Sequence, residues 1–524
     1  MNAVSGATSR KVVVVGAGPG GLATAMLMRA AGAQVTVIER EDRVGGRTAS
    51  FTQDGYTFDY GPTFYLYPEV LQEIFRACGR DLFEEVDLRQ LDPMYRLQFD
   101  DGTTFDATPD VERLTAEAAK ISPTDAVNVP AYLQEQIDKF AVFKPILQRP
   151  FNGPADLVKP DMLKAFPLFR PWLTVDQDLR RFFKSEDLRL AFSFQSKYLG
   201  MSPFKCPSLF TIVAHVEYGF GVFHPVGGCN AIPRAMARVA TEIGVDIRLN
   251  EPAEAIEFDG RRAKAVRTPN GTYEADAVVV NADFAGTIRK LIPNRLRRRW
   301  TDQKIDAKKY SCSTFMLYLG LDRRFDDLSH HTIHLSGDYL KNIQEIDDGQ
   351  APEEPTIYVQ NASVTDPTLA PEGCSTLYVL VPTGNLEGGV DWESFGPVYR
   401  ERVLDRLENL TGHDIRPHIR TERMITPADW QAQMGIHQGA TFNLAHNLGQ
   451  MLHWRPRNRF EDVDGVYLTG GGTHPGSGLP TIFESARIAS RLAADDLGLD
   501  SSQLPQELPT QPEFSDKPYK EAAE

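Results

Sequence analysis

The sequence predicts an α/β protein in which a parallel-sheet domain is interleaved with a second, discontinuous lobe of α+β type. Three stretches predict this fold. The β-branched run Lys11–Val15 leads into a glycine-rich turn and a helix. A second unit of helix, strand, hairpin and buried strand spans Phe220–Asp283, and another glycine-rich loop precedes a helix at Gly470–Ser490. With 524 residues the chain exceeds what one core needs, so two or more lobes are expected.

Composition and charge narrow the class of protein. Apolar residues make up 42% and charged residues 24%, as in ordinary globular proteins. The net charge of −15 argues against nucleic acid as a partner. Five cysteines without a CxxC pair favour reduced thiols over a disulfide framework or a zinc ribbon. The chain begins without a signal-peptide core and has no apolar run of about 18 residues, so we expect a cytoplasmic protein without a spanning helix.

The first unit is a Rossmann-type strand, turn and helix. A buried parallel strand is expected at Lys11–Val15, a helix at Leu22–Ala31 and a second strand at Gln34–Glu39. A lone GxGxxG motif is a weak signal, but this one follows a predicted strand and begins a predicted helix. An acidic residue, Glu39, also follows 23 residues after its first glycine. That context predicts a dinucleotide-binding turn.

The glycines of this turn have separate roles. Gly16 permits the tight turn, Gly18 lets the backbone approach a pyrophosphate, and Gly21 lets helix and strand pack closely. The helix N-terminus offers unpaired N–H groups to the phosphates, and Glu39 accepts hydrogen bonds from ribose. The cofactor contacts predicted for this unit are Gly16, Ala17, Gly18, Pro19, Gly20, Gly21, Glu39 and Arg40.

The stretch EREDRVGGRTASFTQDGYTFDYGPTFY follows, and Arg47 within it can add a charge to the pyrophosphate. Here the chain resembles the flavoprotein superfamily of amine oxidases, protoporphyrinogen oxidases and carotenoid desaturases. The resemblance implies a glutathione reductase-like FAD-binding domain, with FAD as cofactor. It also implies contacts from Gly45, Gly46, Arg47, Thr48, Gly61, Pro62 and Thr63. In the second unit it places Ala253, where valine is usual, beside the adenine.

The glycine-rich loop near the end of the chain is expected to reach the flavin. Gly470–Gly472 follow a short strand, Pro480 suits a first helical turn, and Thr481–Leu497 is amphipathic. A helix that starts there directs its positive end at the flavin ring. The motif GTHPGxGxP closely resembles bacterial carotenoid desaturases of the phytoene desaturase type, over roughly residues 10–498. It adds Gly472, Thr473, Pro480, Thr481 and Ile482 to the cofactor contacts.

The resemblance divides the chain into interleaved parts. The FAD-binding domain is expected from residues 1–70, 215–300 and 440–498. A substrate and membrane-docking lobe is expected from residues 71–214 and 301–439. The polar, proline-bearing stretch 499–524 is expected to be a disordered tail.

The chemistry implied is desaturation of an apolar polyene by hydride transfer to flavin, followed by loss of a proton. A single dinucleotide fingerprint suggests that electrons pass on to quinone or oxygen, since NAD(P)H-dependent flavoenzymes usually carry a second one. The substrate stays open between a C40 phytoene-type chain and a C30 diapophytoene-type chain. Carotenoid oxidases and retinol saturases are related alternatives. A non-catalytic lipid carrier, like the GDP-dissociation-inhibitor relatives, is the alternative of a different class.

Histidines are candidates for the remaining chemistry. His474 lies inside the terminal loop and is a candidate acid–base group, as is His446. His330 and His334 share one face of a predicted strand with Thr332, but no acid or thiolate stands near them. We therefore expect surface or packing histidines and no metal.

The segment Lys139–Arg170 carries six Lys or Arg and two Asp in a chain that is acidic overall, with aromatic and aliphatic residues between them. This pattern favours a monotopic, peripheral membrane-docking surface, because a polyene substrate resides in the bilayer. The alternative is a helix pair with solvated basic faces. Five aromatic residues are candidates to line a substrate tunnel, although a core role is more common: Phe192, Phe194, Tyr198, Phe204 and Phe210.

Overall fold

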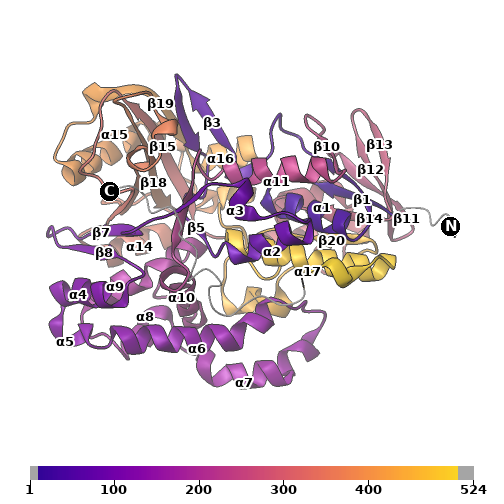
Figure 1. The fold of residues 1–524 in the computed structure, drawn as a ribbon, viewed down its shortest axis with the longest axis horizontal. Helices are drawn as coiled ribbons and strands as arrows, with labels where there is room; N and C mark the ends of the chain where they lie inside the picture. The colour runs from indigo at the N-terminus through magenta and orange to yellow at the C-terminus, as the bar shows by residue number, and fades with distance from the viewer. Residues whose placement is uncertain (1–9, 506–524) are drawn as a thin grey trace.

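The structure is a computed structural model that describes residues 10–505. Figure 1 shows two sheets side by side, with a group of helices along the lower edge. The five-stranded sheet lies at the right, the seven-stranded sheet at the upper left, and α7 (Pro160–Phe169) lowest. The predicted α/β fold class is confirmed.

A parallel sheet forms the first domain, in the strand order β10-β2-β1-β14-β20. Its strands are β1 (Lys11–Val15), β2 (Gln34–Ile38), β10 (Asp246–Arg248), β14 (Ala277–Val280) and β20 (Val466–Leu468). Three chain segments that lie far apart in the sequence therefore share one sheet. The domain boundaries given above stay a prediction.

Both faces of this sheet are covered. Val12 and Val14 face α1 (Pro19–Ala30), together with α11 (Ala231–Glu242) and α17 (Leu479–Leu497). Val13 and Val15 face the opposite side, against the antiparallel strands β11 (Ala255–Asp259), β12 (Arg262–Thr268) and β13 (Gly271–Glu274) and helix α12 (Phe284–Leu291). A strand buried on both faces reads as a continuous apolar run, which is why KVVVV is so uniform.

The second sheet has the order β19-β15-β18-β17-β16-β7-β8. All of its pairs are antiparallel except β16 with β7. Its strands are β7 (Tyr95–Gln98), β8 (Thr104–Ala107), β15 (Ser313–Leu321), β16 (His331–His334), β17 (Ile357–Gln360), β18 (Ser375–Thr383) and β19 (Ile419–Ile425). Strands from both halves of the predicted substrate lobe thus meet in one sheet.

Strand periodicity gives this sheet two different faces. Leu377, Val379 and Val381 of β18 pack toward α15 (Trp392–Thr411). Tyr378 and Leu380 point the other way and line a cavity. The same alternation holds along β15 and β17, so one face of the sheet is core and the other is the wall of a site.

Helices complete the lobe below this sheet. They are α4 (Val111–Ile121), α5 (Pro123–Ala126), α6 (Val129–Leu147), α7, α8 (Val175–Leu179), α9 (Glu186–Ser193) and α10 (Val213–Tyr218). A small sheet, β5 (Tyr65–Leu66), β9 (Val222–Pro225) and β6 (Leu88–Gln90), lies beside them. No helix within residues 10–505 is long and apolar enough to cross a membrane.

The predicted tail is partly wrong. Ser501–Gln503 forms the short helix η13, and Leu504 is buried in the core beside α17. An apolar side chain fixes these residues despite their polar neighbours. Residues 506–524 of the predicted tail lie outside the described part.

Candidate functional site

The glycine-rich turn after β1 has the geometry predicted for it. Gly16 has φ +99°, and a Cβ there would lie 2.3 Å from the Asn281 carbonyl oxygen. A Cβ at Gly21 would lie 2.0 Å from the Gly16 carbonyl oxygen, so helix and turn pack too closely for a side chain. The N-cap of α1, Gly18, provides no side-chain cap, and Pro19 opens the helix. The first-turn N–H groups, including that of Gly20, are therefore left for a ligand such as a phosphate.

Glu39 closes the other side of this turn. Its carboxylate accepts hydrogen bonds from the backbone N–H groups of Ala17 at 2.7 Å and Glu41 at 3.0 Å. Burial raises the pKa of Glu39, and these two hydrogen bonds offset part of the effect. The Glu251 N–H donates to the Glu39 carbonyl oxygen at 2.7 Å, which brings half-buried Ala253 into the same neighbourhood.

The Arg40 side chain does not join this group, so its assignment to the cofactor stays a prediction without support from the side-chain contacts. It donates to the Gln433 carbonyl oxygen at 3.0 Å and pairs with Glu41 at 2.8 Å on the surface. Because β2 ends at Ile38, the next side chain after Glu39 turns away from the turn.

The GGR segment lies directly against the turn. The Gly45 N–H donates to the Ala17 carbonyl oxygen at 2.9 Å, and a Cβ on Gly46 would lie 3.4 Å from the Gly18 Cα. Arg47 donates to the Thr441 carbonyl oxygen at 2.6 Å. Burial lowers the pKa of Arg47, and nearby Asp283 opposes this. A half-buried guanidinium beside free helical N–H groups is a donor set that suits a pyrophosphate.

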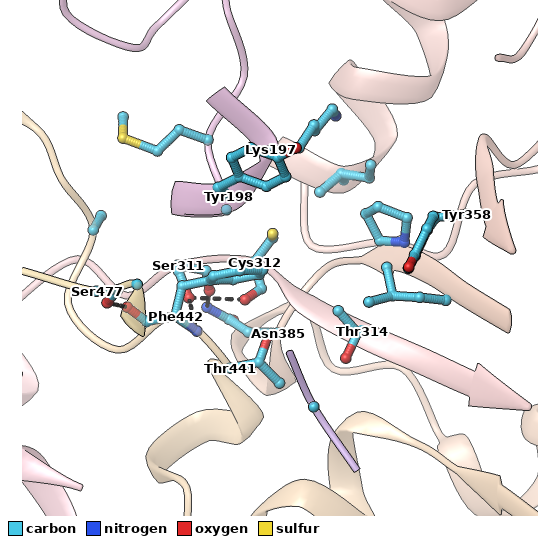
Figure 2. Close-up of a pocket in the computed structure, with 18 of the residues that line it drawn as sticks. Lys197, Tyr198, Ser311, Cys312, Thr314, Tyr358, Asn385, Thr441, Phe442 and Ser477 are labelled. Atoms are coloured by element: carbon cyan, nitrogen blue, oxygen red, sulfur yellow. Dashed lines mark hydrogen bonds between the residues drawn. The ribbon is translucent and has the colours of Figure 1, made fainter. Parts of the chain in front are cut away.

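A cavity of about 820 Å³ extends from this point between the two sheets. Its inner end is lined by Arg47, Thr48 and Gly61–Phe64. The residues Ser477–Pro480 and Ile482 also line it. Figure 2 shows Lys197 and Tyr198 on one side, opposite Ser311, Cys312 and Phe442. The outer end is bordered by exposed charged residues: Lys205, Lys309, Asp347, Asp348 and Glu387.

The terminal glycine-rich loop meets the cavity only through its last residues. Helix α17 begins at Leu479, and its N-cap Gly478 has φ +108° and no side-chain cap. Gly478 and Pro480 line the cavity, so the free helix N-terminus points at the inner end. Thr481 instead donates back to the Ser477 carbonyl oxygen at 2.8 Å.

The earlier part of this loop faces protein. A Cβ on Gly472 would lie 2.6 Å from the Phe284 Cβ, and the Thr473 hydroxyl donates to the Pro456 carbonyl oxygen at 2.5 Å. Neither residue lines the cavity. Their assignment as cofactor contacts stays a prediction that concerns the backbone alone, because Gly472 packs against Phe284 of α12 and the Thr473 hydroxyl bonds Pro456.

His474 does not line the cavity, so its assignment as an acid–base group has no support from the geometry. Its ring lies 5.0 Å from that of Phe151, away from the cavity lining. Burial lowers the pKa of His474 to about 3, with nearby Arg455 adding to the effect, so the imidazole is neutral. His446 has a structural contact: its Nε2 accepts from the Ser477 N–H at 3.1 Å and holds the loop.

The histidines of the predicted strand, His330, His331 and His334, are buried rather than exposed. His331 stacks on Phe64 with ring centroids 4.1 Å apart, and its Nδ1 lies 2.8 Å from the Tyr358 hydroxyl. Burial lowers the pKa of His330 and His331 well below the usual value. Among the described residues no group of three or more His, Cys, Asp or Glu is placed to hold a metal ion.

Two of the five candidate tunnel aromatics line the cavity, namely Phe194 and Tyr198. Phe192 is in the core, and Phe204 and Phe210 pack at its edge. Sequence reasoning missed the aromatic wall supplied by the second sheet, including Tyr358 and Tyr378. The alternation in STLYVLVPT was a usable signal, since its two faces differ in polarity.

The segment Lys139–Arg170 is not a free basic surface. Lys139 is fully buried and donates to Asp178 at 2.6 Å, and Arg170 pairs with Glu135 at 2.8 Å. Lys144 is buried as well, whereas Lys159 and Lys164 are exposed. The basic residues predicted to face lipid are thus mostly internal partners of acids.

An apolar surface stands out in the same place. Six of the eleven exposed large hydrophobic residues within residues 10–505 belong to this segment, to the loop directly after it, and to the short helices η11 (Leu448–Gln450) and η12 (Leu452–Trp454). We call this set the apolar patch: Val158, Leu163, Phe166, Trp172, Leu448 and Trp454. The rings of Phe166 and Trp172 lie 5.9 Å apart, and η12 contacts the helix η2 (Pro154–Val158).

The sequence matches the family described as flavin containing amine oxidoreductase over residues 19–494. It is 42% identical to a 4,4'-diapophytoene desaturase (4,4'-diapolycopene-forming) from Methylomonas sp, over 93% of this chain and 95% of that protein. It is 40% identical to an all-trans-zeta-carotene desaturase from Myxococcus xanthus, over 95% of both. Wild-type putrescine oxidase bound to putrescine shares the fold, with a TM-score of 0.61, 18% identity and coverage of 94% and 99%.

Proposed function

The chain belongs to the flavin-containing amine oxidoreductase family, with FAD as its cofactor, and we propose that it is a desaturase that introduces carbon–carbon double bonds into a carotenoid precursor. The single observation that carries this proposal is the cavity. It reaches from the Arg47 end to an opening between exposed charged residues, and its walls between these ends are largely aromatic and aliphatic. A long apolar chain fits such a lining far better than a polar substrate does.

The residues present suit FAD. Free N–H groups at α1, the close approach of Gly46 to Gly18, and half-buried Arg47 together suit a pyrophosphate. Glu39 would accept the ribose hydroxyls in addition to its backbone partners. Bound FAD supplies the acceptor for a hydride. The protein residues position the polyene and keep water from the inner end of the cavity.

The substrate is a C30 or a C40 precursor, and the two relatives reported above are almost equally similar to this chain. Expression in two hosts, one that makes C30 and one that makes C40 precursors, followed by pigment analysis, tests the proposal. We expect a product with a longer conjugated system in at least one host and a yellow, flavin-containing purified protein. Colourless precursor in both hosts, with flavin bound, would contradict the proposed reaction.

We further propose quinone or oxygen as the electron acceptor, supported by the single dinucleotide fingerprint. Reduced flavin should be reoxidised by a soluble quinone or by oxygen under stopped-flow conditions, and NAD(P)⁺ should have no effect.

The apolar patch is the proposed membrane contact. Side chains such as Leu163, Phe166 and Trp172 are 62%, 54% and 64% exposed, which is costly in water and favourable in an interface. The patch also adjoins the substrate site, because Asn447 lines the cavity and Leu448 is the next residue in the chain. A polyene can therefore pass from the bilayer into the cavity with little exposure to water. Lys159 and Lys164 at its edge suit anionic lipid.

A further inference from the structure

Glu217, on α10, is an acidic residue buried inside the predicted substrate lobe. It is 0% exposed, and within residues 10–505 no Lys, Arg or His forms an ion pair with it. Acidic side chains are rarely buried without a cationic partner, because removal of a carboxylate from water costs free energy that only such a partner or a metal usually offsets. Packing alone does not explain this residue.

Three neutral donors hold the carboxylate. Its Oε1 accepts from the Tyr95 hydroxyl at 2.6 Å and the Gln195 side-chain amide at 2.9 Å, and its Oε2 accepts from the Tyr198 hydroxyl at 2.7 Å. Burial raises the pKa of Glu217, and these hydrogen bonds offset part of the rise. The three hydrogen bonds thus stabilise the carboxylate anion, while burial favours its protonated, neutral form.

Tyr198 connects this acid to the cavity. It lines the cavity, and its ring lies 5.4 Å from that of Phe64, which follows Gly61–Thr63 directly. The carboxylates that line the cavity themselves stand at its exposed outer end. Among the described lining residues, Tyr198 is the tyrosine whose hydroxyl donates to a buried carboxylate.

A rival pair exists on the facing wall, where the Tyr358 hydroxyl lies 2.8 Å from Nδ1 of His331. Burial acts on this pair in the opposite sense. It lowers the pKa of His331, because the protonated imidazole is the charged form, whereas the protonated form of Glu217 is neutral. Proton uptake at His331 would create a buried charge, and at Glu217 it would remove one.

We propose that Tyr198 receives the proton that the substrate loses, and that Glu217 acts through it as the residue that takes up the proton of the Tyr198 hydroxyl. This inference rests on the proposed desaturation. A hydride leaves one carbon with its electron pair for bound FAD. The C–H bond on the adjacent carbon breaks, its electron pair forms the new π bond, and its proton joins Oη of Tyr198 while the hydroxyl proton moves to Oε2 of Glu217. The quinone or oxygen that reoxidises the cofactor takes up two protons with its two electrons, and Glu217 returns one of them.

The kinetic test compares Glu217→Gln and Tyr198→Phe with the matched control Tyr358→Phe. We expect kcat to fall by about 10²-fold in the first two variants, with KM and FAD content little changed, and clearly less in the control. Wild-type kcat should fall as the pH drops through the raised pKa of Glu217, since the base form is required, and Glu217→Gln should lack this step. The titratable neighbours Tyr95, Tyr132, Tyr198 and Tyr218 stay neutral here, because their own pKa values are raised.

A second measurement needs neither FAD nor turnover. Infrared difference spectra between the wild type and Glu217→Gln, recorded on FAD-free protein, report the carbonyl stretch of a protonated carboxyl group. We expect this band to appear only as the pH is lowered, at a pH above the usual range for Glu. A band present at every working pH, or a fully active Glu217→Gln, overturns the inference. Absence of product from the wild type would instead overturn the proposed function, whatever the infrared result.

Discussion

Removal of the apolar patch should release the protein from membranes. The change is the triple variant Leu163→Ser, Phe166→Ser and Trp172→Ser on α7 and the loop after it. Full burial of such a side chain contributes about 1.5–3 kcal/mol, and these three are a little over half exposed. Each should therefore contribute about 1–2 kcal/mol, and the three about 4 kcal/mol, which corresponds to a loss of roughly 10³-fold in partitioning.

Flotation with neutral liposomes measures this partitioning without an electrostatic contribution. The matched control is Leu340→Ser with Val398→Ser, two side chains that are 54% and 58% exposed on α14 (Tyr339–Asp347) and α15. The control should float like the wild type. If the triple variant and the wild type partition equally, the patch is ordinary surface and the reasoning fails.

Charge supplies the second arm of this experiment. Lys159→Glu with Lys164→Glu should weaken binding to anionic liposomes only, by about 1 kcal/mol for each basic residue removed. Arg170 is left unchanged, because it is only 17% exposed between Glu135 and Asp178 and a charge reversal there would test folding, whereas Lys159 is 50% exposed in its ion pair with Asp156. Equal loss from neutral and anionic liposomes would show that the two lysines do not act through lipid charge.

Three further predictions concern the cofactor, the terminal loop and pH. Glu39→Ala and Gly18→Val should each purify with little flavin absorbance, since one removes the ribose acceptor and the other places a side chain at the pyrophosphate turn. His474→Gln should reduce kcat less than the 10²–10⁴-fold of a lost acid–base group, as a pigment assay on flavin-loaded protein would show. Burial alone would raise the pKa of Asp366, but hydrogen bonds led by that from His224 lower it to about 2. Its contribution to stability should therefore be lost as the pH falls from about 4 toward 2, and thermal unfolding of Asp366→Asn should lack this part of the profile.

The first domain could be predicted because the sequence patterns of its strands and of its glycine-rich turn each lie within a few consecutive residues. The strand Lys11–Val15 was predicted with the bounds found, and Gly16 and Gly21 have the steric roles assigned to them. A turn that needs φ above zero, and a helix that starts without a side-chain cap, depend on neighbours in sequence. The family resemblance and the FAD prediction rested on the same stretches and are confirmed.

Predictions for individual side chains were less reliable, because spacing along the sequence does not determine the direction in which a side chain points. Arg40 stands next to Glu39, which faces the turn, yet its own side chain lies at the surface. Gly472 and Thr473 belong to the same loop as Gly478, which lines the cavity, yet they pack against protein. His474 occupies a glycine-rich loop, and that position is why the sequence made it a candidate acid–base group. The ring of His474 packs instead against Phe151, which follows α6 and lies far from His474 in the sequence.

The sequence by itself therefore determined the family, the cofactor and the conformation of the glycine-rich turn, because backbone conformation there is encoded within a few residues. Only the tertiary structure decided which side chains line the cavity, which basic residues are buried in ion pairs, and where apolar side chains gather outside. It also brought Tyr95, Gln195 and Tyr198 around Glu217 from separate segments. The physical reason is that burial, and the pKa changes it causes, depend on what packs around a group in space, which the sequence near that group does not specify.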